Sequence, residues 1–178
     1  DSWKLEITPL GTTAFTVLTS GGTNVNDGPL AVIDPTKLAN GLYTLRLTAA
    51  DIAGRTTTAQ TKIEVSTTTK PTAYKLSEID AMVVIGGINF PITRYYDSQS
   101  AGNSGELGNG WSLLPREVNL QTSVETTGRE AIGLFTAFSA GTRVYLTLPT
   151  GQRVGFTFNP QPVSVQGVTI YAPHWDLD

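Results

Sequence analysis

The sequence contains no cysteine and a single histidine, His174. Disulfides and thiolate chemistry are therefore excluded. A zinc site would need more Cys or His ligands than the chain has. A Ser/His/Asp triad would have to use His174, and the chain has no G-x-S-x-G motif. We therefore expect no catalytic residue, no metal ligand and no cofactor, and we predict that the chain is not an enzyme.

Paired carboxylates of a glycosidase are the one catalytic arrangement that the composition leaves conceivable. The candidate side chains are Glu78, Asp80, Glu106, Glu117, Glu125 and Glu130. Acidic residues on strand faces are usually solvated, and the sequence singles out no pair among these six.

Charge is also scarce, because Asp, Glu, Lys and Arg make up 15% of the 178 residues and the net charge is -3. No two basic residues are adjacent, so the sequence predicts no nucleic-acid partner. The longest apolar run, residues 81–85, is too short to span a bilayer. The residues after Asp1 lack the apolar core of a signal peptide, so we expect a mature N-terminus or an internal fragment.

Threonine is the most frequent residue, and glycine occurs 18 times. β-Branched threonine suits half-buried strands, and glycine suits the turns between them. Apolar and polar residues alternate in five rows, which are residues 3–7, 43–49, 63–65, 144–148 and 154–158. A period of two is typical of β-strands, and no window shows a sustained helical period. The sequence therefore predicts an all-β fold.

A polar, threonine-rich stretch at residues 67–73 ends near Pro71 and predicts a linker. We place one domain at residues 1–66 and another at residues 74–178. Because neither end carries the elements that would complete its domain, we expect the natural chain to continue beyond Asp1 and Asp178.

Residues 40–49 begin with a turn, followed by Tyr43 and an alternating strand. This pattern resembles strand F of immunoglobulin-like and fibronectin-like sandwiches, in which such a tyrosine bonds back to nearby backbone. The other strands that this resemblance implies are C at 3–8, C′ or D at 15–18, E at 30–33 and G at 61–65. Strands A and B have no residues to form them, so we predict a partial sandwich. Its role is that of a spacer or, as the alternative, of a carbohydrate-binding module.

Three scattered acidic residues of this domain, Asp27, Asp34 and Asp51, could suggest calcium. They lack the spacing of a loop site. We expect them to act in turns and caps.

The most specific pattern lies in two runs: residues 87–98 read GINFPITRYYDS, and residues 105–113 read GELGNGWSL. They resemble the start of the β-shell in Rhs/YD-repeat proteins. The matching positions are Arg94, Tyr96, Asp97, Ser98, Gly105, Leu107, Gly108, Gly110 and Trp111. Two departures are Asn89-Phe90-Pro91, which has extra residues before the proline, and Asn109, at a place that is often aromatic. Residues 148–158 resemble the family's L-x-D-G-R hairpin, with Thr150 where Asp is common, and residues 171–173 its Y-x-P element.

Each residue of this motif also has a structural reading. Asp97 and Ser98 can cap a turn by bonding to backbone, and the glycines permit backbone angles closed to other residues. Trp111 can bury a large face, and Arg94 can pair with Asp97 or with loop carbonyls. We expect these residues, together with Tyr43, to be structural rather than catalytic.

The resemblance implies a large protein, secreted or on the bacterial cell surface, whose repeats wind into a hollow shell around a C-terminal toxin. The partners of this segment would be the remainder of the same polypeptide and the enclosed toxin. Two alternatives stay open: a cell-surface adhesin or glycan-binding module, and the accessory part of a secreted hydrolase.

Overall fold

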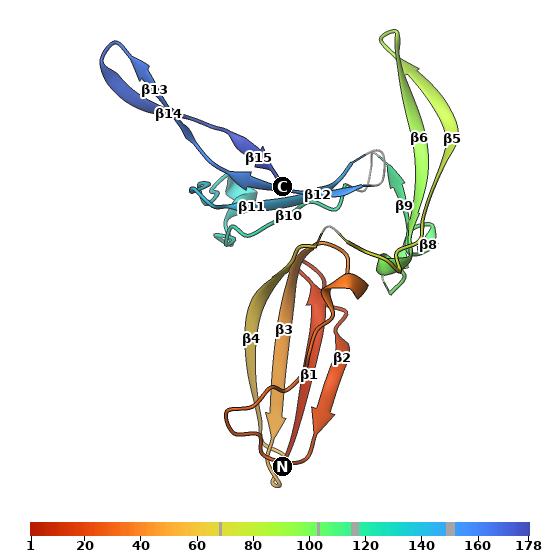
Figure 1. Ribbon diagram of the computed structural model, residues 1–178, viewed down its shortest axis with the longest axis vertical. Coiled ribbons are helices and arrows are strands. Elements are labelled where there is room, and N and C mark those ends of the chain that lie inside the picture. Colours follow the sequence, from red (N-terminus) through yellow and green to blue (C-terminus); the bar gives the residue numbers. More distant parts are fainter. Residues whose placement is uncertain (68, 103, 115–117, 149–151) are drawn as a thin grey trace. The chain divides into compact units, whose positions relative to one another are not determined.

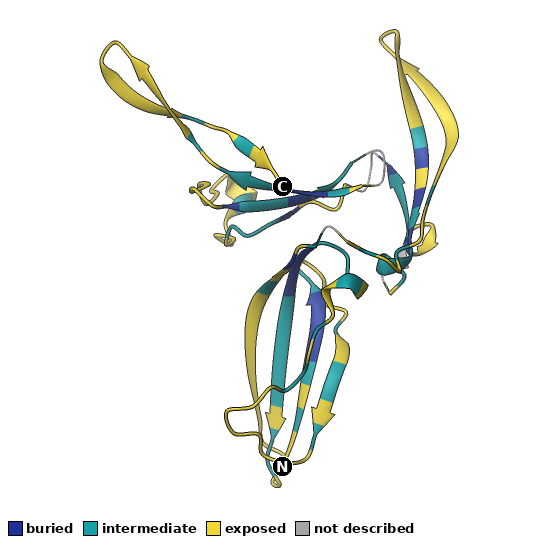
Figure 2. Cartoon of the chain, viewed as in Figure 1, coloured by how far each residue is buried: buried dark blue, intermediate teal, exposed yellow. Residues whose placement is uncertain are grey.

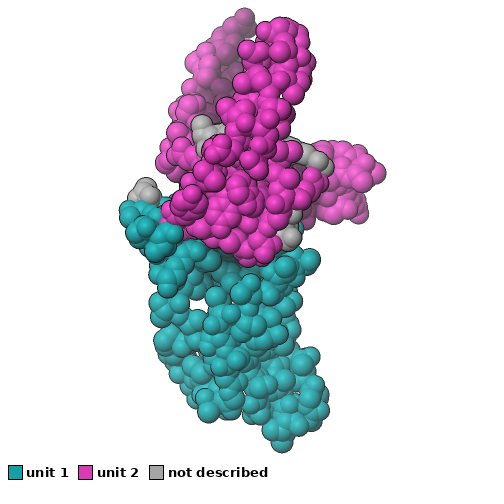
Figure 3. Space-filling model, turned by 90° about the vertical axis from the view of Figure 1, so that its right-hand side faces the viewer, with its two compact units in different colours: residues 1–72 teal, residues 73–178 magenta. Residues whose placement is uncertain are grey.

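A computed structural model describes residues 1–178 except 68, 103, 115–117 and 149–151. The chain forms two compact units, Asp1–Thr72 and Ala73–Asp178 (Figure 3). Strands dominate both units, so the all-β prediction is confirmed. Helical structure in the described residues is confined to three short 3-10 turns: η1 (Pro35–Lys37), η2 (Ser98–Ser100) and η3 (Glu130–Ile132).

The first unit contains one antiparallel sheet with the strand order β2-β1-β3-β4 (Figure 1). Its strands are β1 (Ser2–Pro9), β2 (Thr16–Gly21), β3 (Gly41–Ala50) and β4 (Thr56–Val65). The strand predicted at residues 30–33 is wrong, because that segment lies in the connection between β2 and β3. Pro29 and Pro35 flank it closely, and proline cannot donate to a ladder.

The core of this unit gathers at the end of the sheet where β3 begins. Ile7, Tyr43 and Val65 are buried there, and Ile33 and Leu38 from the long connection pack against them. Of the segment predicted as a strand, Ile33 therefore packs on the sheet, whereas Val32 is 93% exposed.

The second unit begins with a long hairpin of β5 (Lys75–Ile85) and β6 (Ile88–Asp97), extended by β9 (Trp111–Leu114). Gly86 and Gly87 form its two-residue turn with φ of 58° and 82°, in the left-handed region that suits hairpin turns. The β5–β6 register shifts between Ile79 and Ala81. The short strands β7 (Ser104–Gly105) and β8 (Gly108–Asn109) pair in the loop before β9.

A further sheet has the order β10-β11-β12-β15. Its strands are β10 (Gln121–Thr122), β11 (Arg143–Thr147), β12 (Arg153–Phe158) and β15 (Trp175–Leu177). The strands predicted in residues 144–148 and 154–158 are confirmed, although the turn at 149–151 lies outside the described residues. A second hairpin, β13 (Gln161–Val165) and β14 (Val168–Ala172), follows β12.

Burial is uneven along the two hairpins of the second unit (Figure 2). All residues of 77–91 and 161–171 are exposed, although many are large and apolar. Buried residues are found where three or more strands lie together, as at Tyr95, Leu114 and Tyr145.

Candidate functional site

The two runs of the shell-like motif meet where β6 ends. Tyr96 on β6 pairs with Trp111 on β9, and their ring centroids lie 5.2 Å apart. The backbone N–H of Asp97 donates to the carbonyl of Gly110 at 2.9 Å. Residues more than ten positions apart in the sequence therefore form one contact cluster, which we call the β6–β9 junction (Tyr96, Asp97, Ser98, Gly110 and Trp111).

Gly110 is the tightest point of the β6–β9 junction. Its φ is 74°, a conformation that residues with a Cβ rarely adopt. A Cβ added here would lie 2.9 Å from the carbonyl oxygen of Asp97 and 2.9 Å from the ring of Tyr96. Glycine is thus required at this position both by backbone angle and by space.

Asp97 caps the turn η2, whereas Ser98 bonds to the backbone of Tyr74 before β5. One carboxylate oxygen of Asp97 accepts the backbone N–H of Gln99 at 2.9 Å. The hydroxyl oxygen of Ser98 accepts the N–H of Tyr74 at 2.9 Å, and the N–H of Ser98 donates to the Tyr74 carbonyl. The junction is therefore held to the start of β5 as well as to β9.

Among the described residues, the ion-pair partner of Arg94 is neither Asp97 nor a loop carbonyl, the two partners expected from the sequence. Its Nε lies 3.0 Å from the carboxylate of Asp80 on β5. Asp80 is the extra residue of the register shift, and such a bulge redirects a side chain. The guanidinium also lies 5.7 Å from the ring centre of Trp111. Nothing in the sequence marked Asp80 as the partner, because the bulge sets its direction.

Two glycines of the motif do not reach the junction. Gly105 lies in β7 and Gly108 in β8, and these strands pair with each other. Gly108 has a φ of 105°, but a Cβ there would meet nothing within 4 Å. These glycines therefore shape the short β7–β8 turn, and Gly108 is needed for its backbone angle alone.

Tyr95, beside the junction, is buried, and its hydroxyl has no hydrogen-bond partner among the described residues. Burial, together with the nearby Asp97 carboxylate, raises the pKa of Tyr95 far above its ordinary value. The phenol is therefore neutral at physiological pH, so it is unsuited to act as a base.

Tyr43, in the first unit, donates its hydroxyl hydrogen to the carbonyl of Ala39 at 2.8 Å. A bond from a strand-F tyrosine to backbone a few residues upstream is the feature called the tyrosine corner. Asn40 adds a second link, because its side chain exchanges two hydrogen bonds of 3.1 Å with the backbone of Thr67. The entry to β3 is thereby fixed to the end of β4.

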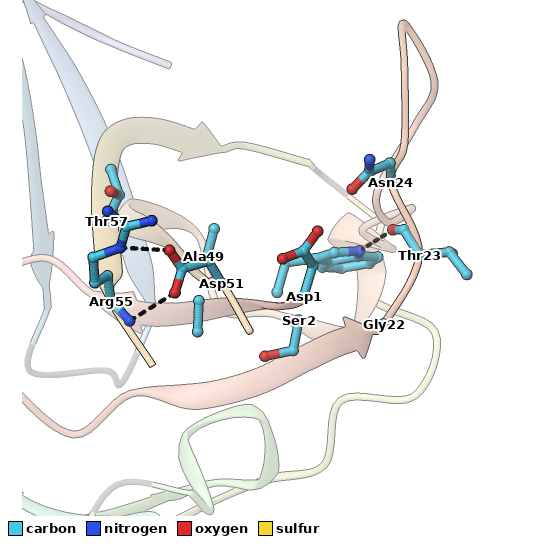
Figure 4. Close-up of a pocket in the computed structure, with 11 residues that line it drawn as sticks. Asp1, Ser2, Gly22, Thr23, Asn24, Ala49, Asp51, Arg55 and Thr57 are labelled. Atoms are coloured by element: carbon cyan, nitrogen blue, oxygen red, sulfur yellow. Dashed lines mark hydrogen bonds and ion pairs between the residues drawn. The ribbon is translucent and has the colours of Figure 1, made fainter. Parts of the chain in front are cut away.

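An open groove lies at the opposite end of the same sheet, between Asp1, Thr23 and Asp51 (Figure 4). Two of its charged side chains engage each other: Asp51 accepts the N–H groups of Ala53 and Arg55 and forms an ion pair with Arg55 at 2.6 Å. The Trp3 ring N–H donates to the Thr23 carbonyl. These bonds tie the turns at this end of the sheet together.

The turn and cap roles expected for two scattered acidic residues are confirmed. Asp34 caps η1 by accepting the N–H and hydroxyl of Thr36. Hydrogen bonds from Thr36 lower the pKa of Asp34, and bonds from Arg55 lower that of Asp51.

A polar cluster on the β11–β12 hairpin was missed by the sequence analysis. The ring of Tyr145 is buried between two guanidiniums, 5.5 Å from that of Arg143 and 5.9 Å from that of Arg153. Arg143 forms an ion pair with Asp178 at 2.6 Å, and Arg153 donates to Gln121 at 2.6 Å. Gly155, opposite Tyr145, leaves room for the ring. These contacts depend on the register between β11 and β12, which cannot be derived from the sequence alone.

No group of three or more acidic, His or Cys side chains within the described residues is arranged to hold a metal ion. Of the six glycosidase candidates, Asp80 pairs with Arg94, Glu130 accepts the Thr127 N–H, and Glu117 lies outside the described residues. In the part of the chain that the structure describes, no helix has the length and hydropathy needed to cross a membrane.

Comparisons with protein-family models, with curated proteins and with solved structures found no match to this chain.

Proposed function

We propose that this chain is a non-catalytic structural segment of a large secreted Rhs/YD-repeat protein. Its role is to help start or close the β-shell that encloses a C-terminal toxin. Its partners are the remainder of the same polypeptide and the enclosed toxin, and it acts outside the cell or on the bacterial cell surface.

The β6–β9 junction is the observation that carries this proposal. The two runs that resemble the shell entry are separated by a polar loop, yet the Tyr96 ring packs at a tilt against Trp111 and Asp97 bonds to Gly110. The most constrained residue, Gly110, is one of the matched positions. A motif whose residues are used to fix strands to one another supports a scaffold role rather than a chemical one.

The first unit adds weaker support. Its order β2-β1-β3-β4 corresponds to the order C′-C-F-G of one sheet of an immunoglobulin-like sandwich. The bond from Tyr43 to Ala39 lies where a tyrosine corner belongs in strand F. This likeness favours the spacer role over that of a carbohydrate-binding module.

Deleting residues 105–111 tests the scaffold role. Without Gly110 and Trp111 we expect β6 to lose its pairing with β9 and the second unit to become sensitive to protease. The control is an equally long deletion in the exposed segment 131–137 of the same unit. Unchanged protease resistance after the first deletion, measured by the half-life of the intact band, counts against the proposal.

A further inference from the structure

The distal part of β5 has an open edge. In the part of the chain that the structure describes, β6 is the only strand paired with β5. The outer side of β5 therefore presents unpaired backbone N–H and C=O groups. Residues 81–85 carry no charge and no proline. Their four large side chains are 40–65% exposed, on both faces of the hairpin: Met82, Val83, Val84 and Ile85.

The other edge of the same hairpin is blocked by Pro91, which lies opposite Met82. Proline has no N–H, so it fits a hairpin only where its nitrogen points away from the partner strand. Facing residues of an antiparallel pair share this orientation, so the N–H of Met82 also points outward, on the β5 side. Two positions further along the hairpin, Val84 and Asn89 face each other, and their N–H groups also point outward.

A lipid bilayer is a poor match for this surface. Unpaired backbone groups cost several kcal/mol each in hydrocarbon, and open sheet edges do not occur there. A second β-strand supplies both what the backbone needs, N–H and C=O groups, and what the side chains need, apolar contact.

We propose that the open edge of β5 pairs with the same edge of a second copy of this chain. An antiparallel pairing around a two-fold axis at Val83 sets Met82 of one copy opposite Val84 of the other. The outward N–H groups of both residues then join the new ladder. Ala81 faces Ile85 of the second copy, and Asp80 lies beyond the last apolar pair, opposite Gly86. No two charged side chains oppose each other, as a self-complementary interface requires.

Pro91 makes this assembly stop at two copies. The paired hairpins form a four-stranded sheet with β6 at each outside edge, and Pro91 removes an outward donor from both of these edges. Five residues from each copy give a small contact, below the roughly 1,000 Å² of a stable interface, so we expect dissociation in the micromolar range. The inference goes beyond the proposed function, because it concerns the chain by itself.

Sedimentation equilibrium of the full chain, from about 1 to 100 µM, tests the proposal. We expect a monomer–dimer equilibrium. Val84→Pro removes the outward N–H of β5 without touching the β5–β6 ladder, and we expect it to weaken the dimer at least tenfold. The matched control, Asn89→Pro, makes the same change in the facing residue on the blocked β6 side. We expect its dimer constant to stay within about twofold of that of the unmodified chain.

A chain that stays monomeric over the whole range overturns the proposal, and so does an Asn89→Pro variant that weakens the dimer as much as Val84→Pro does. Circular dichroism of both variants establishes that the hairpin is intact. Pro91→Val restores the missing N–H donor on β6, so we expect this variant to form species larger than the dimer. If the variant forms dimers and nothing larger, Pro91 does not limit the assembly to two copies. These outcomes are independent of the 105–111 deletion, which tests the shell proposal.

Discussion

Single residues hold this chain together mainly through backbone geometry and hydrogen bonds to backbone. Gly110 is confined by its φ and by the Asp97 carbonyl, and Tyr43 is tied to Ala39. Few side chains are buried, so each of these local links carries a large share of the stability of its unit. The clearest predictions therefore concern such links.

Gly110→Ala should destabilise the second unit by about 2–3 kcal/mol, because the left-handed backbone is strained and the new Cβ meets the Asp97 carbonyl. Gly108→Ala is the control for strain alone, since its Cβ would meet nothing, and it should cost about 1 kcal/mol. Urea unfolding followed by Trp fluorescence measures both. Equal costs for the two variants would show that the close contact at Gly110 is unimportant.

Tyr43→Phe should lower the free energy of unfolding of the first unit by about 1 kcal/mol, because the Ala39 carbonyl loses its donor. Tyr171→Phe serves as the control, since Tyr171 is 69% exposed, and we expect no measurable change. Thermal unfolding of the two variants, side by side, makes the comparison. A Tyr43→Phe variant as stable as the control would argue against a structural tyrosine corner.

Glu6 gives the first unit a dependence on pH. Hydrogen bonds from Lys4 and Arg46 hold the pKa of Glu6 below its ordinary value, although burial acts in the opposite direction. A lowered pKa in the folded state stabilises the fold above the ordinary pKa of about 4.3, and this stabilisation is lost as pH falls further. Glu6→Gln should therefore show a smaller loss of melting temperature on acidification than the unmodified chain. An unchanged loss would mean that Glu6 titrates normally.

At the scale of elements, period-two alternation was sufficient to predict β1, β3, β11 and β12, although their burial does not follow the alternation. β3 is buried or half-buried on both faces along most of its length, and in β11 the most buried residue is Tyr145, on the face opposite the apolar row. The alternation failed at residues 30–33, an apolar run between two prolines, where Ile33 packs against the core of the sheet without forming a strand. It also missed most of β5, whose exposed residues follow no simple alternation. The Arg94–Asp80 pair and the Tyr145 cluster depend on a bulge and on strand register, which only the folded chain defines.

The Tyr145 cluster supports the β11–β12 hairpin. Tyr145→Ala should cost about 3–5 kcal/mol, because it removes a buried ring and leaves a cavity opposite Gly155. Leu177→Ala, in β15 of the same sheet, is the matched control, since Leu177 is 64% exposed, and its cost should be below about 1 kcal/mol. Chemical unfolding of both variants provides the test, and a small effect at Tyr145 would contradict its assignment to the core.

At the scale of the whole molecule, many large apolar side chains are exposed, and contiguous exposed apolar surface commonly marks an interaction site. The two hairpins carry many of them, whereas the buried residues form small separate groups. Such a distribution suits a segment that other strands cover, which is what the shell proposal requires.

The isolated chain should therefore bind an apolar dye such as ANS at neutral pH without being unfolded. Replacing Ile85 and Ile88, 61% and 62% exposed at the tip of the first hairpin, by Thr should reduce the dye fluorescence. Thr keeps the β-branched shape, so the hairpin itself should persist. Dye binding that is absent, or unaffected by the double substitution, would contradict an accessible apolar hairpin.

The central claim is that this chain is a structural segment of a β-shell. The most direct test is to sequence the complete reading frame that contains it. We predict many Tyr-Asp repeats encoded downstream of Asp178, followed by a toxin region. A reading frame without such repeats would contradict the shell assignment.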